Sequence, residues 1–125
     1  MENIKELIQE KFNSIESVSC GLAIPDGLVP LNTNYFGYEL QETYVDSDLN
    51  KNYLMEVSLT GRLVRRYNEE EDTMKELYNA LEDIKSALKE LNFTYSYNDI
   101  TLDDNYRKVL VKANCRYYEA NNELV

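Results

Sequence analysis

The first fifteen residues carry their hydrophobic side chains at the spacing of an amphipathic helix. Apolar residues recur three or four positions apart, with Glu and Lys between them, at Ile4, Leu7, Ile8, Phe12 and Ile15. Residues 72–91 repeat this spacing over a longer stretch, at Met74, Leu77, Tyr78, Leu81, Ile84, Leu88 and Leu91. Thr73 and Glu76 have the spacing of a capping box at the start of this second segment. The pattern therefore predicts two helices, over 2–15 and 72–91, each packed by one face.

Four other segments alternate apolar and polar side chains, as half-buried β-strands do. Two of them lie within 35–66 and predict a hairpin, with apolar positions at Phe36, Tyr38, Leu40 and Tyr44, then at Tyr53, Met55, Val57, Leu59 and Leu63. The other two, 93–97 and 107–119, follow the second helix and predict another pair of strands.

The segment between the first helix and the first strand has no such period. Residues 20–34 contain both prolines of the chain and the turn sequence Pro25-Asp26-Gly27, which predicts a long irregular loop or binding arm. The element order is therefore α-β-β-α-β-β. It predicts a single α+β domain over 1–125, with a two-layer, mainly antiparallel four-stranded sheet and two helices packed on one face. The other sheet face is expected to be polar and to meet solvent or partners.

Composition narrows the class of function. The chain has 13 basic and 23 acidic residues and a net charge of −10, so we expect no broad nucleic-acid-binding groove. It contains no His, the commonest general base and a usual zinc ligand, and Cys20 and Cys115 are too few for a disulfide framework. We therefore expect a protein that is not an enzyme, with no catalytic, cofactor-binding or metal-binding residues. The N-terminus lacks the features of a secretory signal and no apolar run approaches the roughly 20 residues of a membrane span, so we expect synthesis in the cytosol and no membrane contact.

One stretch, VDSDLNKN at 45–52, has acidic and amide residues at the spacing of the first calcium-loop ligands: Asp46, Asp48 and Asn50. A calcium loop of this kind also needs Gly at the sixth position and Glu at the twelfth, where this chain has Lys51 and Val57. Strands rather than helices are predicted on both sides. We interpret the stretch as a solvated hairpin loop.

A run of opposite charges is the strongest candidate for an interaction site. Three arginines are followed closely by four acids: Arg62, Arg65, Arg66, Glu69, Glu70, Glu71 and Asp72. They are either exposed charges at a strand end and a helix start, or complementary patches that meet across a subunit interface in a head-to-tail ring. On the second interpretation, replacing Arg65 and Arg66 with Glu is expected to weaken ring formation and leave the fold intact.

Five segments represent the predicted helices, loop and strands in chain order: NIKELIQEKF, GLAIPDGLVPLN, YLMEVSLTGRLVRR, DTMKELYNALEDIKSALKEL and RKVLVKANCRYYE. In order, size and character these segments resemble the tail terminator proteins of long-tailed bacteriophages, and more loosely other head-to-tail joining proteins. The resemblance covers nearly the whole chain.

The resemblance implies a non-enzymatic structural subunit of a phage or prophage tail. Such subunits form a six-membered ring that caps the tail tube and joins it to the head connector, so the implied partners are further copies, the tail tube protein and the head connector protein. DNA passes through the ring only as cargo, and the implied location is the virion tail after synthesis in the host cytoplasm. The family supplies no interface residues for this chain. The alternative is a small acidic cytosolic binding protein, chaperone-like or inhibitor-like, which would be a monomer or a twofold dimer.

Overall fold

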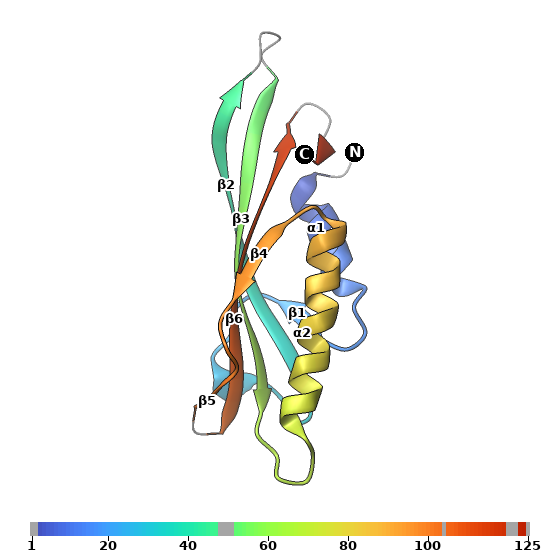
Figure 1. Ribbon diagram of the computed structural model, residues 1–125, viewed down its shortest axis with the longest axis vertical. Coiled ribbons are helices and arrows are strands. Elements are labelled where there is room, and N and C mark those ends of the chain that lie inside the picture. Colours follow the sequence, from blue (N-terminus) through green and yellow to red (C-terminus); the bar gives the residue numbers. More distant parts are fainter. Residues whose placement is uncertain (1–2, 48–51, 104, 120–122, 125) are drawn as a thin grey trace.

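Two helices lie on one face of a mixed β-sheet in the computed structural model, which describes residues 3–47, 52–103, 105–119 and 123–124 (Figure 1). The helices are α1 (Ile4–Asn13) and α2 (Thr73–Glu90), and a short 3-10 turn spans Asp26–Leu28. The strands are β1 (Ser19–Gly21), β2 (Asn34–Ser47), β3 (Tyr53–Arg66), β4 (Thr94–Tyr97), β5 (Thr101–Asp103), β6 (Tyr106–Tyr118) and β7 (Glu123–Leu124). Neither helix of this described part has the length and hydropathy that crossing a bilayer requires.

The predicted four-stranded, mainly antiparallel sheet is wrong: the sheet has more strands and is mixed, with one parallel pair. Seven strands of the described chain join one sheet in the order β1-β2-β3-β6-β4, and β5 and β7 also pair with β6. Strand β1 overlaps the start of the segment predicted as loop, at Cys20 and Gly21, and pairs in parallel with Tyr35–Gly37 of β2. Strands β1, β5 and β7 have only two or three residues each, too few to show an alternating pattern.

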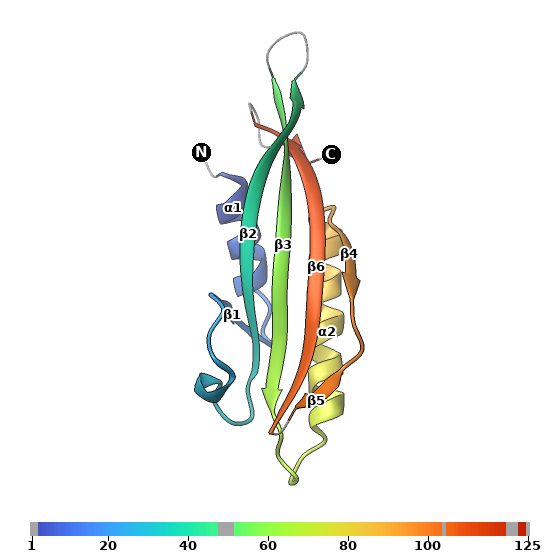
Figure 2. The same cartoon turned by 90° about the vertical axis from the view of Figure 1, so that its left-hand side faces the viewer.

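The predicted hairpin over 35–66 is confirmed as the antiparallel pair β2 and β3. Its far end extends beyond the two helices, as Figures 1 and 2 show. The register is regular from Asn34 opposite Arg65 to Tyr44 opposite Met55, and it shifts between Tyr44 and Asp46. A bulge of this kind increases the local twist of a strand pair.

The core lies between the helices and the sheet. Helix α1 buries Ile4, Ile8 and Phe12 and helix α2 buries Leu77, Leu81, Ile84 and Leu88, which confirms the predicted helical spacing at these positions. Met74 and Tyr78 were predicted on the same packed face and are exposed instead. The ring centroid of Phe12 lies 5.6 Å from that of Phe36 and 5.0 Å from that of Tyr38, so an aromatic cluster attaches α1 to β2. Burying each such large side chain contributes about 1.5–3 kcal/mol.

The helix starts are fixed by side-chain caps. Asn3 accepts a hydrogen bond from the Glu6 N–H at 2.9 Å, and Asp72 accepts one from the Lys75 N–H at 3.1 Å. The predicted capping role of Thr73 is therefore wrong. Thr73 is buried, and its hydroxyl accepts a hydrogen bond from Arg107 Nε at 2.7 Å.

Candidate interaction surface

Residues 22–33, here called the arm, fold back over the sheet face opposite the helices (Figure 1). The backbone passes so close to β2 that a Cβ on Gly37 would stand 2.8 Å from the Cα of Ala23. The Tyr35 hydroxyl donates a hydrogen bond of 2.6 Å to the carbonyl of Leu22, and Val29 is fully buried. The predicted loop is therefore held against the sheet rather than extended into solvent.

Asp26 is the main electrostatic link between the arm and the sheet. Its two carboxylate oxygens lie 2.8 Å from Arg62 Nη1 and 2.9 Å from Lys108 Nζ. Arg62 Nη2 also donates to the carbonyl of Ile24 at 2.7 Å, and Arg66 Nη2 donates to the carbonyl of Gly27 at 3.1 Å. Since the Asp26 side chain is only 19% exposed, these charges are partly shielded from water and fix the arm more firmly than a fully exposed pair does.

The arm presents apolar side chains to solvent. Leu22 is 79% exposed, Leu28 is 66% exposed and Leu31 is 50% exposed. Large apolar side chains on a firmly held loop are typical of protein-binding surfaces. The turn chemistry of 20–34 indicated a binding arm, but only the structure shows which side chains it exposes and that Asp26 holds it in place.

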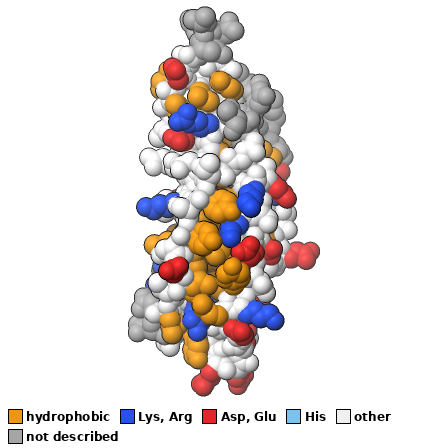
Figure 3. Space-filling model, in the orientation of Figure 1, with side chains coloured by type: hydrophobic (Ala, Val, Ile, Leu, Met, Phe, Trp, Pro, Cys, Tyr) orange, Lys and Arg blue, Asp and Glu red, His pale blue; other side chains and the backbone are white. Residues whose placement is uncertain are grey.

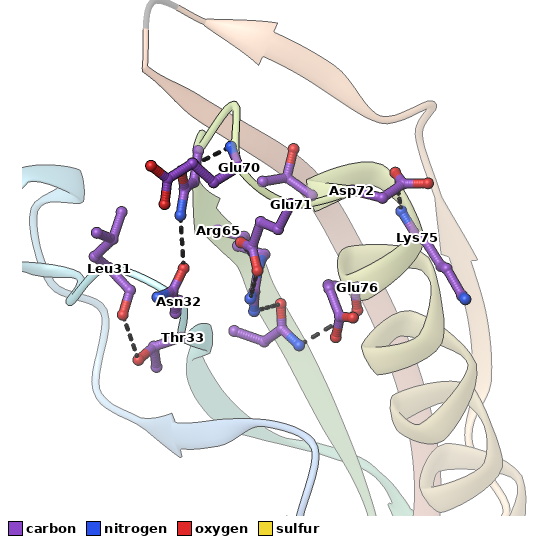
Figure 4. Close-up of polar contacts among 12 residues, drawn as sticks. Leu31, Asn32, Thr33, Arg65, Glu70, Glu71, Asp72, Lys75 and Glu76 are labelled. Carbon is purple, nitrogen blue, oxygen red and sulfur yellow. Dashed lines mark hydrogen bonds and ion pairs between the residues drawn. The ribbon is translucent and has the colours of Figure 1, made fainter.

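The predicted charge cluster lies where the end of β3 meets the start of α2. Arg65 is only 5% exposed, and its Nε and Nη2 donate to the two carboxylate oxygens of Glu71 at 2.9 and 2.8 Å (Figure 4). Its Nη1 donates to Asn34 Oδ1 at 2.9 Å, and the Asn34 amide donates in turn to the carbonyls of Ser17 and Glu76. The hydrogen bonds from Arg65 lower the pKa of the Glu71 carboxyl, against a smaller opposing effect of partial burial.

The remaining residues of the cluster are divided between the arm, the helix and solvent. Arg62 and Arg66 contact the arm, and Asp72 caps α2. The side chains of Glu69 and Glu70 are exposed in the loop between β3 and α2. The subunit interface at these seven residues stays a prediction. The expectation that replacing Arg65 and Arg66 with Glu leaves the fold intact conflicts with the burial of Arg65.

A second apolar surface lies at the edge of the sheet formed by β4 and β5, and it continues onto the adjoining flank of α2. Figure 3 shows apolar side chains gathered there in a band with charged side chains along its borders. Its exposed members are Met74, Tyr78, Tyr97 and Leu102. Lys85 lies over Tyr97, with its Nζ 4.9 Å from the ring centre and 3.4 Å from the hydroxyl. We call this surface the Tyr97 side. The sequence pattern predicted Tyr97 in a strand but did not predict that it lies on an exposed surface.

A groove of about 370 Å³ lies beside the opposite edge of the sheet, between α1 and β2. Its lining comes from Lys5, Gln9, Asn13, Cys20, Gly21, Leu22, Tyr38 and Leu40. Burial raises the pKa of the Cys20 thiol to about 11, so this thiol is protonated at neutral pH and contributes apolar surface to the groove. We call it the Leu22 groove.

Metal binding finds no geometric support in the part of the chain that the structure describes, where no group of three or more His, Cys, Asp or Glu side chains lies close enough to hold an ion. Of the candidate calcium residues, Asp48 and Asn50 lie outside the described residues. Asp46 accepts a hydrogen bond from the N–H of Ser47 at 2.8 Å. Comparison of the sequence with protein-family models and with curated proteins gives no match to either.

Proposed function

We propose that this chain is a structural subunit of a phage or prophage tail, the tail terminator, which forms a ring that caps the tail tube and joins it to the head connector. The proposal combines the resemblance in element order with one observation on this molecule. The two edges of its sheet differ in charge and in apolar surface, as the two unlike surfaces of a head-to-tail contact must.

The charge difference carries the proposal. Strand β2 holds three acidic residues, Glu39, Glu42 and Asp46, and no Lys or Arg. Strand β6 holds four basic residues and no Asp or Glu; they are Arg107, Lys108, Lys112 and Arg116. Strand β2 is therefore acidic and strand β6 basic. A rotation that repeats the subunit brings the acidic side of one copy to the basic side of the next, whereas a twofold axis brings like sides together.

Part of this charge is balanced within the chain. Lys108 pairs with Asp26, and Arg116 Nε lies 3.9 Å from a Glu56 carboxylate oxygen. Glu39 and Lys112 are exposed, and the structure gives neither of them an ion pair within its described residues. These two side chains are the strongest candidates for charge contacts between copies.

The apolar surfaces support the same arrangement. The Leu22 groove is concave and lies on the acidic side, while the Tyr97 side presents protruding rings on the other. A stable protein interface combines an apolar centre with a polar rim, and these two surfaces provide both.

The test of the ring is the native mass of the purified chain over a concentration series, followed by negative-stain imaging of the largest species. The proposal predicts a closed ring with a central hole, six-membered if the resemblance holds in detail. A stable twofold dimer contradicts it.

The terminator role needs a second experiment in the phage or prophage that encodes the chain. If the ring stops tube growth, deleting the gene gives tail tubes of uncontrolled length without heads, and supplying the gene in trans restores normal tails. Normal tail length after deletion contradicts the terminator role, even if the chain forms a ring.

The net charge of −10 favours one other function, a small acidic binding protein that docks a basic partner. Such a protein would remain a monomer or twofold dimer over the same concentration series. Its binding to a basic protein would weaken steeply with added salt, because exposed charges are screened beyond about 8–10 Å at physiological ionic strength.

A further inference from the structure

The backbone register places β4 level with a short part of β2 on the far side of the sheet. Thr94 pairs with Asn114, which pairs with Ser58, which pairs with Gln41. Followed in the same way across β6 and β3, Tyr97 is level with Tyr38. Strand β4 therefore lies at the height of residues 38–41.

Residues 38–41 are also where the outer edge of β2 becomes free. Strand β1 covers this edge only at Tyr35–Gly37, and within the described residues no strand pairs with it beyond Gly37. Strand β4 pairs with β6 along one edge, and no described strand pairs with its other edge. A free edge offers its N–H and C=O groups to another strand, and sheet proteins commonly block it with charged side chains, especially Lys, or with Pro. Strand β4 contains neither a charged residue nor Pro, and residues 38–41 contain one charge, Glu39.

The groove beside this edge can receive side chains from an added strand. Tyr38 and Leu40 point to its interior face, Leu22 borders it, and α1 forms its other wall. Tyr95 and Tyr97 lie on the corresponding face of β4, because they pair with the buried residues Ala113 and Val111. A strand added at 38–41 in the orientation of β4 would turn two tyrosine rings toward the groove.

We propose that β4 of one copy pairs with residues 38–41 of β2 in the next copy, and that this contact joins the subunits. The inference rests on the ring proposed above. Since β2, β3, β6 and β4 alternate in direction along the sheet, β2 and β4 are antiparallel, and rotation about an axis along the strands preserves that relation. A closed ring has no rise between subunits, so each strand keeps its height. Tyr97 then lies opposite Tyr38, and Ser96 opposite Glu39. The same register places Asn98 and β5 of the next copy beside Tyr35–Gly37, where β1 pairs in the single chain, so the contact requires β1 to leave this edge of β2.

This register also pairs the two exposed charges. Ser96 pairs with Lys112 within its own chain. With Glu39 of the neighbouring copy on the other side of Ser96, the Glu39 and Lys112 backbones stand two strand spacings apart, about 10 Å. Their side chains extend on the same sheet face, and the small Ser96 side chain leaves them room to meet.

The apolar part of the contact is tested by Tyr97→Glu against Tyr53→Glu. The two tyrosines are matched in exposure, at 47% and 46%, but Tyr53 lies near the far end of the hairpin, paired with Ser47. We expect Tyr97→Glu to weaken self-association at least tenfold by native mass and sedimentation, and Tyr53→Glu to change it less than twofold. Circular dichroism and thermal melting of both variants check that each is folded. Equal effects of the two variants overturn the inference.

The charged part is tested by Glu39→Lys, Lys112→Glu and the double variant, all at exposed positions. Each single change replaces attraction with repulsion at every contact and is expected to weaken association several-fold. The double variant restores the pair in reverse and is expected to regain most of the wild-type affinity. Rings that form equally well in both single variants overturn the edge pairing while the ring itself stands. A wild-type chain that stays monomeric at millimolar concentration overturns both this inference and the ring.

Discussion

The cluster around Arg65 and the Leu22 groove differ in how far one chain satisfies its own groups. Arg65 is 5% exposed, and three of its nitrogens donate to Glu71 and Asn34 of the same chain. Leu22 is 79% exposed beside an edge of β2 that no described strand pairs with beyond Gly37. The polar groups of Arg65 are satisfied within the subunit, whereas the Leu22 groove keeps apolar surface exposed to solvent.

This difference shows that part of a dense run of charges can be satisfied within one chain. Opposite charges close in sequence can reach one another within the chain, and Arg65 and Glu71, six residues apart, do so. An interface is better sought where apolar surface and backbone hydrogen-bonding groups remain uncovered after folding.

The largest expected effect is at Arg65. Arg65→Ala leaves the Glu71 carboxylate and the buried Asn34 amide without their charged partner, which is expected to cost about 3–5 kcal/mol of folding stability. Chemical denaturation measures the loss, and Glu70→Ala, at an exposed neighbour in the same loop, is the matched control with less than about 0.5 kcal/mol expected. Equal stability of the two variants would contradict the claim that this region is completed within the chain.

A smaller effect is expected at the link between the arm and the sheet. Asp26→Asn removes the charge that Arg62 and Lys108 share, and we expect a loss of about 1–2 kcal/mol, between the values for exposed and buried pairs. Limited proteolysis should then cut the arm faster than in the wild type. An unchanged cutting rate would show that Val29 and the backbone contacts hold the arm without Asp26.

The Arg65 cluster also predicts a pH dependence. Because the folded chain lowers the pKa of Glu71, its ion pair stabilises the fold above the unfolded pKa of about 4.3 and is lost as the pH falls through the lower folded value. Denaturation of the wild type and Glu71→Gln across this acidic range measures the difference. The variant should be less stable near neutral pH and lose less stability on acidification, and parallel pH profiles would contradict the assignment.

The smallest effect on folding is expected in the groove. Leu22→Ser removes an apolar side chain that is mostly in solvent already, so the folding stability should change by less than about 0.5 kcal/mol. If the groove receives a neighbouring copy, the same change should weaken self-association several-fold. A Leu22→Ser variant that associates as the wild type does would remove Leu22 from the contact.

The hydrophobic period was enough to predict both helices and the long hairpin. Positions such as Ile8, Phe12 and Leu81 recur at helical spacing because they are buried on one face, and the structure buries them. The short strands β1, β5 and β7 could not be predicted in this way. They are strands because they lie beside β2 or β6, which is a property of the tertiary structure rather than of their own residues.

The sequence contains a signal for the burial of Arg65. Arg65 has the same parity as Leu59 and Leu63 on β3, which is the face covered by α2, whereas Arg62 and Arg66 have the opposite parity. Alternation alone thus placed one arginine of the three toward the core. The free edge at 38–41 had no such signal, because it depends on where β1 ends in space.

The most direct test of the central claim, that unlike sheet edges meet, uses two variants in a Cys20→Ser background, each with one introduced cysteine beside the native, buried Cys115. Gln41→Cys and Thr94→Cys lie at exposed, level positions on opposite sides of the sheet, and antiparallel pairing would bring their Cα atoms to about 4.5–5.5 Å, within disulfide reach. Each variant is oxidised alone and mixed with the other, and peptide mass spectrometry identifies the linked positions. We predict a 41–94 disulfide only in the mixture. Disulfides between like positions, 41 with 41 or 94 with 94, with none between 41 and 94, would contradict the head-to-tail account and indicate a twofold dimer.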